Sequence, residues 1–97
     1  MEGGKISLED ILGARNKIRM LKLFIKREFI TFSELRRAVR LNYNTLKEYI
    51  KTLVDAGIIK EYEISRFRIY ELNKDDPKVQ SLVYLFKVWG EIEGNNA

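Results

Sequence analysis

The sequence predicts a mainly α-helical domain with one small β-hairpin. Three observations carry this prediction. Residues 33–57 have the spacing of two short helices joined by a tight turn, and residues 58–72 are rich in β-branched and aromatic residues, as in paired strands. Residues 8–25 and 77–93 repeat apolar side chains at helical spacing. A chain of 97 residues fits a single domain, here 1–97.

The first third of the chain predicts a helix and a short strand. Apolar residues recur at helical spacing from Leu8 to Ile25, with Ser7 as a plausible N-cap. Gly13 is expected to split this region into a short lead-in helix and a main helix. Residues 29–31 are a candidate short strand, and residues 1–5 are expected to be frayed.

The middle of the chain carries strong start and stop signals. The segment Thr31-Phe32-Ser33-Glu34 matches a capping box, so the next helix begins there. Arg40-Leu41-Asn42 forms the turn, Asn42 caps the following helix 43–56, and Gly57 ends it. The helix–turn–helix is therefore expected to span residues 33–57.

The hairpin and the last helix follow directly. Residues 58–64 and 67–72 are the predicted strands, with Ser65-Arg66 at the tip. Asp76-Pro77 then places an N-cap and a first-turn proline at the start of a helix that is expected to run to about Glu93.

Composition limits the function. The formal net charge is +4, yet residues 13–72 carry fourteen Lys and Arg against seven Asp and Glu, which suits a polyanionic partner. The absence of Cys and His excludes disulfides, thiolate or imidazole metal sites and Ser–His or Cys–His catalysis. No metal, cofactor or enzymatic activity is expected.

The same composition bears on location. The apolar runs are too short for a membrane span and the N-terminus lacks a secretory signal. A cytoplasmic, nucleoid-associated protein is therefore expected. Eleven Ile, many Lys and Glu and a single Gln are typical of thermophile proteins.

Two groups of side chains point to double-stranded DNA. Helical geometry turns polar residues of helix 43–56 away from the core; Asn and Thr can read base edges there, and Lys can reach guanine or phosphate. The candidate residues are Tyr43, Asn44, Thr45, Lys47, Glu48 and Lys51. Arg36, Arg37 and Arg40 are candidates for phosphate contacts that set register. Arg66 and Arg68 are expected at the tip of the hairpin, on a phosphate or in the minor groove.

The last helix has a wide apolar face. Val79, Val83 and Phe86 form one stripe, which is expected to cover the domain. A second stripe, consisting of Leu82, Leu85, Trp89 and Ile92, is expected to meet the same helix of a second copy. The alternative is that the whole helix folds onto its own domain.

Residues 11–72 resemble the winged helix-turn-helix transcriptional regulators of archaea and bacteria, of the broad ArsR/MarR-like type. The resemblance rests on TFSELRRAVRLNYNTLKEYIKTLVDAGIIKEY followed by RFRIYELN. It implies a winged helix-turn-helix core, 7–76, to which the second apolar stripe adds a C-terminal dimerisation helix, 77–93. It further implies a homodimer on a pseudo-palindromic duplex, with helix 43–56 in the major groove and wing 58–72 beside it. Metal-sensing members use Cys and His, which this chain lacks; any small-molecule effector is undetermined.

Two other functions stay open from the sequence. One is an architectural, nucleoid-type protein with little sequence preference. The other is a winged-helix protein-interaction module without DNA contacts of its own, against which the basic helix before the turn argues.

Overall fold

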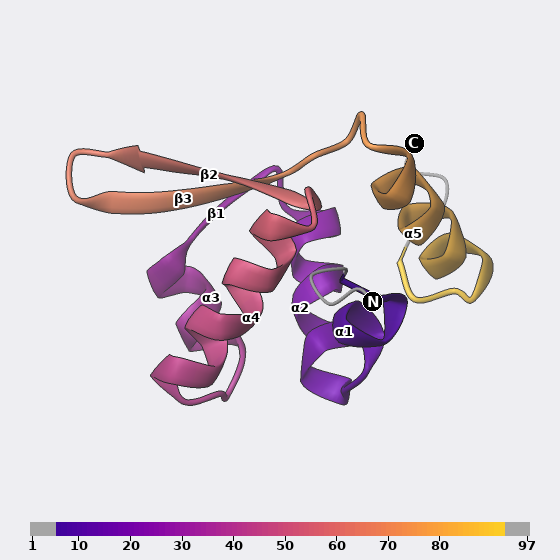
Figure 1. Cartoon of the computed structure of the whole chain (residues 1–97), viewed down its shortest axis with the longest axis horizontal. Coiled ribbons are helices and arrows are strands. Elements are labelled where there is room, and N and C mark those ends of the chain that lie inside the picture. The colour runs from indigo at the N-terminus through magenta and orange to yellow at the C-terminus, as the bar shows by residue number, and fades with distance from the viewer. Residues whose placement is uncertain (1–5, 93–97) are drawn as a thin grey trace.

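A computed structural model describes residues 6–92 of the chain. It contains five helices and a three-stranded sheet within those residues, arranged as a helical body with a projecting hairpin (Figure 1). The elements are α1 (Leu8–Leu12), α2 (Arg15–Lys26), β1 (Phe29–Thr31), α3 (Phe32–Ala38), α4 (Tyr43–Asp55), β2 (Ile59–Ile64), β3 (Phe67–Leu72) and α5 (Pro77–Val88). The predicted fold class, mainly α-helical with a winged helix-turn-helix, is confirmed.

Local capping signals set the helix starts. The Ser7 hydroxyl accepts a hydrogen bond from the backbone of Asp10, and the Asp10 carboxylate accepts one from the backbone of Ser7 at 2.9 Å. Gly13 is the C-cap of α1, so the expected split between α1 and α2 is present. Thr31 and Glu34 form the second reciprocal box at the start of α3. The backbone N–H of Thr31 is the main reason that the Glu34 pKa lies below its usual value.

The last helix is shorter than the sequence analysis expects. α5 ends at Val88 rather than near Glu93, because Gly90 adopts a left-handed backbone conformation with φ of +73° and breaks the helical path. Glu93 itself lies outside the described residues, as does the expected frayed segment 1–5.

A third strand pairs with the hairpin. β2 and β3 pair antiparallel from Ile59↔Leu72 to Ile64↔Phe67, which leaves a two-residue loop at the tip. β1 joins the other edge of β3, so the strand order is β1-β3-β2. Ser65 in that loop adopts φ of +57°, a left-handed backbone conformation that is most common for glycine, asparagine and aspartate.

One apolar core joins the helices to the base of the sheet. Fully buried side chains come from α2, β1, α3, α4, β3 and α5, and the outer part of the hairpin is exposed. The wing tip extends away from the helical body, and α5 lies at the opposite end of the molecule (Figure 1). The buried core residues are Ile11, Met20, Leu21, Phe24, Ile30, Leu35, Val39, Leu46, Tyr49, Ile50, Leu53, Ile58, Ile59, Tyr70, Leu72, Val79, Leu82 and Phe86.

Tyr49 connects α4 to the N-terminal helices. Its buried hydroxyl donates a hydrogen bond to the Ile11 carbonyl at 2.7 Å, and burial raises the pKa of the phenol.

Tyr49→Phe should lower the free energy of unfolding by about 1–3 kcal/mol, because it leaves a buried carbonyl without its donor. Thermal unfolding measures this loss. The matched variant Tyr62→Phe removes an exposed hydroxyl bonded to Glu71 and should change stability by less than about 0.5 kcal/mol. Equal losses in the two variants would contradict the role of Tyr49.

Candidate nucleic-acid interface

The first turn of α4 is fixed by its N-cap. The Asn42 side-chain oxygen accepts a hydrogen bond from the backbone N–H of Thr45 at 2.8 Å. This bond places Tyr43, Asn44 and Thr45 in the first turn, as the sequence predicts. Asn44 and Thr45 are exposed there and available to a ligand.

The outward face of α4 is exposed along its length. Leu46, Tyr49, Ile50 and Leu53 turn into the core, and helical spacing turns the other side outward. All six candidate residues of this helix are exposed in the structure: Tyr43, Asn44, Thr45, Lys47, Glu48 and Lys51.

Some charges on this face already have partners. Lys51 forms an ion pair with Asp55 one turn later at 2.8 Å, which raises the Lys51 pKa. The neighbouring Thr52 hydroxyl donates back to the carbonyl of Glu48 at 3.1 Å. Lys51 must therefore weaken or share its contact with Asp55 to bind a phosphate.

Aromatic contacts join α3 to the start of α4. The ring of Tyr43 meets the ring of Phe32 edge-on, with centroids 5.6 Å apart. The guanidinium of Arg36 lies 5.2 Å from the Tyr43 ring centroid, and the ammonium of Lys47 lies 5.1 Å from it. The sequence gives Tyr43, Arg36 and Lys47 as separate candidates, and the structure brings the three together.

The arginines of α3 and the following turn are exposed. Arg36 and Arg37 lie in the last turn of α3, and Arg40 follows it. No carboxylate among residues 6–92 lies within 4.0 Å of their guanidinium nitrogens. These three cations can therefore bind phosphates without first breaking an ion pair with a described residue.

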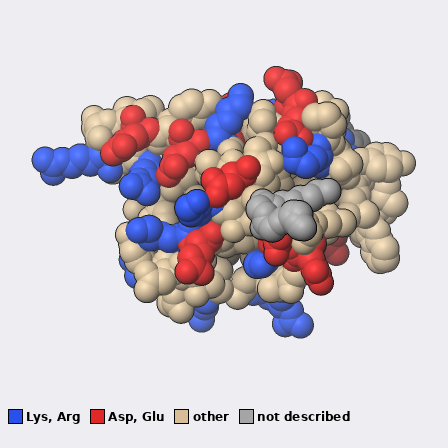
Figure 2. Space-filling model, viewed as in Figure 1, with Lys and Arg blue, Asp and Glu red and all other residues tan. Residues whose placement is uncertain are grey.

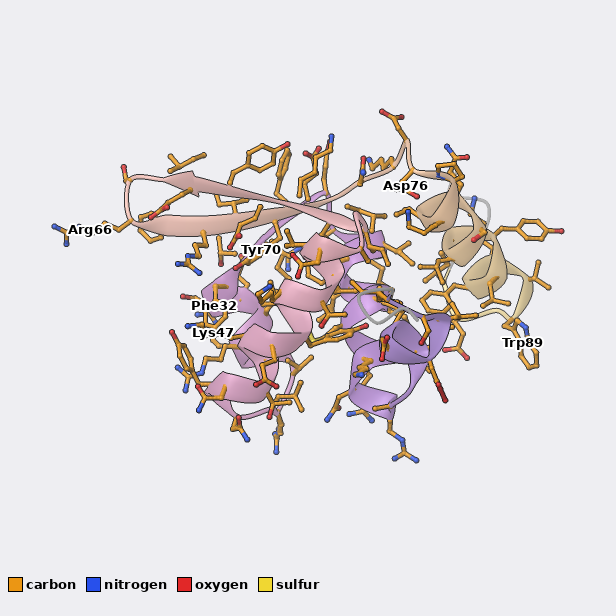
Figure 3. All side chains as sticks on the ribbon, in the orientation of Figure 1. Phe32, Lys47, Arg66, Tyr70, Asp76 and Trp89 are labelled. Carbon is orange, nitrogen blue, oxygen red and sulfur yellow. The ribbon has the colours of Figure 1, made fainter. Side chains whose placement is uncertain are left out.

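The two wing arginines occupy different places. Arg66 belongs to the two-residue loop and points away from the domain (Figure 3). Arg68 lies within β3 rather than at the tip, and its guanidinium is 3.7 Å from the Glu61 carboxylate. Glu61 also accepts a hydrogen bond from the Tyr70 hydroxyl at 3.1 Å. Burial, aided by the Glu61 charge, raises the Tyr70 pKa to about 12.

Two hollows separate α4 from the wing. The larger, of about 560 Å³, lies between the outward face of α4 and the inner face of the hairpin, with Asn44, Glu48 and Arg68 in its wall. The smaller, of about 280 Å³, extends toward the tip between Tyr43 and Arg66. Lys47 lines both. Basic and acidic side chains alternate on this side of the molecule (Figure 2).

Sequence reasoning missed Glu61, Tyr70 and Phe32 in this region. The hairpin register supplies a signal for the first two, because it places Glu61 directly opposite Tyr70. Phe32 carries no such signal, since its contact with Tyr43 depends on how α3 packs beside α4.

The apolar stripes of α5 are divided differently from the prediction. Leu82 is only 7% exposed and packs in the core with Val79 and Phe86, so it is not available to a second copy. Ile92 is half-buried against the same core. Leu85 is exposed, as is Trp89, at 74%. The exposed apolar surface, here called the α5 patch, consists of Tyr84, Leu85, Val88 and Trp89.

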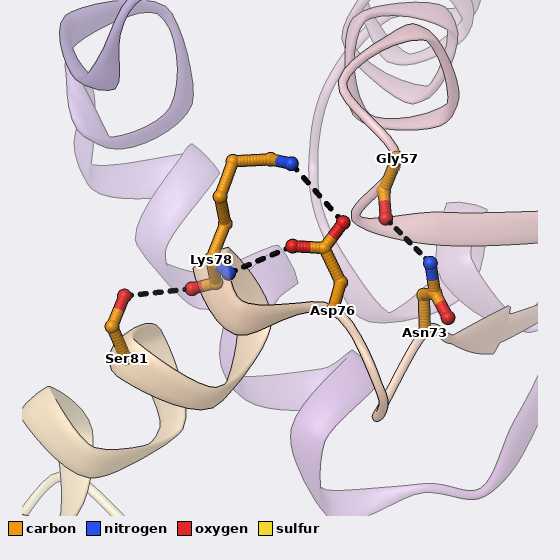
Figure 4. A network of polar contacts seen from close by, with 5 residues as sticks. All are labelled: Gly57, Asn73, Asp76, Lys78 and Ser81. Atoms are coloured by element: carbon orange, nitrogen blue, oxygen red, sulfur yellow. Dashed lines mark hydrogen bonds and ion pairs between the residues drawn. The ribbon is translucent and has the colours of Figure 1, made fainter.

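Polar contacts hold the segment between β3 and α5. The Asn73 side-chain amide donates a hydrogen bond to the carbonyl of Gly57 at 3.0 Å (Figure 4). Gly57 lies just after α4 and adopts φ of +78°. The Asp76 carboxylate accepts a bond from the backbone N–H of Lys78 at 2.7 Å and pairs with its ammonium at 3.1 Å. Lys78 lowers the Asp76 pKa. A short polar connection therefore links the C-terminal ends of α4 and the hairpin to α5.

Residues 6–92 contain neither a candidate metal-binding cluster nor a candidate membrane span. No group of three carboxylates in that range is placed to hold a metal ion. No helix there has the length and apolar character needed to cross a bilayer.

Comparisons with known proteins agree with the fold. Residues 14–60 match the family described as winged helix-turn-helix DNA-binding. No curated protein sequence matches the chain. The structure of an ArsR family transcriptional regulator is similar with a TM-score of 0.62 and 20% identity, covering 88% of this chain and 92% of the other. A possible transcriptional regulator for arsenical resistance aligns with a TM-score of 0.60 and 20% identity, covering 84% and 86%.

Proposed function

We propose that this winged helix-turn-helix protein is a transcriptional regulator that binds double-stranded DNA sequence-specifically as a homodimer. The observation that carries the proposal is the grouping of exposed cations around the start of α4: Arg36 and Lys47 share one aromatic ring, and Lys47 and Arg66 line one hollow. The matched family is described by its DNA binding.

The side chains divide into two roles. The arginines of α3 and its turn bind phosphates and fix the orientation of the domain without reading sequence. α4 enters the major groove, where Asn44 and Thr45 have the chemistry to contact base edges and Lys47 reaches a phosphate. Arg66 and Arg68 extend from the wing to the adjacent backbone or minor groove.

The acidic residues favour a sequence-specific protein over an architectural one. Glu48, Asp55 and Glu61 line the larger hollow among the basic residues. Carboxylates beside a phosphate backbone weaken binding to every duplex, whereas Glu48 gains a hydrogen bond when it meets a cytosine amino group. A surface of this kind suits selection among sequences better than uniform coverage of DNA.

Asn44 tests the role of α4 in reading bases. Asn44→Ala should cost about 1–3 kcal/mol on the preferred site and much less on random duplex, because a lost base contact matters only where the right base is present. Competitive fluorescence anisotropy with both duplexes measures the difference. Thr52→Ala is the matched control, since its hydroxyl is bonded back to the Glu48 carbonyl. Equal losses on both duplexes would place Asn44 among the phosphate contacts.

Selection of bound duplexes from a random pool tests the whole proposal. A regulator should enrich a pseudo-palindromic site and prefer it over random duplex by about 10³-fold or more. Binding without enrichment would support the architectural alternative. Failure to retard any duplex at low salt would overturn the proposal in favour of the protein-interaction module.

A further inference from the structure

We infer that Tyr43 is a positioning residue, whose ring holds Arg36 of α3 and Lys47 of α4 in place for one stretch of DNA backbone. This rests on the proposed function, and it replaces the role that the sequence suggests for Tyr43 as a groove contact. The ring is itself exposed at the beginning of α4.

Two helices build the arrangement by the same spacing. Phe32 and Arg36 are four residues apart in α3, and Tyr43 and Lys47 are four residues apart in α4. Residues at that spacing lie one above the other on a helix face. The two pairs meet at the Tyr43 ring, so these four residues form a quartet across the helix–turn–helix.

Phe32 orients the ring. Its centroid lies 5.6 Å from that of Tyr43, with the planes at 77°, the edge-to-face geometry that aromatic pairs prefer. Phe32 is half-buried and packs against the core, so it fixes the Tyr43 ring from the α3 side. A ring held in this way presents its electron-rich face in a constant direction.

The ring draws both cations toward it. The Arg36 and Lys47 charges lie 5.2 Å and 5.1 Å from its centroid, within the range in which a cation is attracted to an aromatic face. Arg36 and Lys47 otherwise repel each other and lose rotamer freedom on binding DNA. The ring offsets part of that repulsion and restricts both side chains before binding, which lowers the cost of ordering them.

This arrangement links two functions of the motif. Arg36 belongs to the helix that lies across the backbone, and Lys47 belongs to the helix that enters the groove. Because one ring holds both, a displacement of α3 relative to α4 changes the position of both cations. The quartet therefore sets the register of the groove helix against the phosphates.

The test is Tyr43→Leu in two backgrounds. In the unmutated chain this change should weaken binding to the preferred duplex by about 3–10-fold, because Arg36 and Lys47 must then be ordered on binding rather than before it. In an Arg36→Ala/Lys47→Ala background it should cost less than about twofold, because no cation is left to position. An equal loss in both backgrounds would show direct DNA contact by Tyr43 and overturn the inference.

Tyr43→Phe and NMR provide the controls. Phenylalanine keeps the ring face, so this variant should restore most of the affinity that Tyr43→Leu loses; a loss as large as with leucine would make the hydroxyl the determinant and overturn the inference. In the free protein, the Arg36 δ and Lys47 ε protons should show upfield ring-current shifts that disappear in Tyr43→Leu and persist in Tyr43→Phe. Absence of these shifts in the unmutated chain would overturn the quartet even if DNA binding is intact. If no duplex binds, the proposed function and the positioning role fail together, whatever the shifts show.

Discussion

Replacing Arg36, Arg37 and Arg40 together by alanine should weaken binding to all duplexes by a similar factor, on the order of 10²–10³-fold at moderate salt. The three guanidinium groups are exposed and have no described carboxylate partner, so their interaction with phosphates is not offset by lost ion pairs. The slope of log K against log salt should become shallower by about one for each lost contact, hence by about three. Salt titrations monitored by anisotropy measure both quantities.

A matched variant separates phosphate contact from a general charge effect. Lys26, Lys60 and Lys74 are exposed and lie outside α3, α4 and the wing tip. Changing all three to alanine removes the same charge and should lower the slope by far less. Equal slopes in the two triple variants would show that net charge alone controls affinity. A loss restricted to the preferred sequence would instead show that the arginines read bases.

Replacing Leu85 and Trp89 together by alanine should shift the protein from dimer to monomer at micromolar concentration. The α5 patch exposes four large apolar side chains on one short helix, and aromatic anchors at such contacts are typically worth about 2 kcal/mol or more. DNA affinity should fall as well, by about 10²-fold or more, because a monomer engages one half-site and loses the gain from linkage. Analytical ultracentrifugation and anisotropy measure the two effects.

The fold should survive this change. Leu85 and Trp89 are exposed, while Val79, Leu82 and Phe86 still attach α5 to the core, so circular dichroism should be nearly unchanged. Phe29→Ala deletes a comparable exposed aromatic on β1 and should leave the dimer intact. If the unmutated protein already sediments as a monomer, the homodimer part of the proposed function is wrong.

Local hydrogen bonds explain why the helix starts could be predicted. Each cap at Ser7, Thr31, Asn42 and Asp76 joins atoms at most three residues apart, so the sequence determines it without knowledge of the fold. The same holds for the hairpin, whose two-residue loop fixes which residues face each other. The end of α5 had a local signal too, in Gly90, although the apolar pattern beyond it suggested a longer helix.

Contacts between distant residues had no such signal. The pairing of β1 with β3 joins Ile30 to Tyr70, forty residues later, and nothing local specifies it. The stripes of α5 could not be divided because their burial depends on how the helix packs against the core. The domain covers Leu82 instead of leaving it for a second copy.

In the candidate site, too, local features could be predicted and contacts between separate elements could not. Its residue types and their exposure followed from helical periodicity, and their contacts with DNA remain predictions. The sequence alone determined the order of elements, the caps and the polar face of α4, since these depend on neighbouring residues. Tertiary structure alone decided that Phe32 and Arg36 of α3 meet the Tyr43 ring of α4. Such contacts form only where separate elements pack together. How these elements pack is determined by the free energy of burying the whole core, which no short segment of sequence contains.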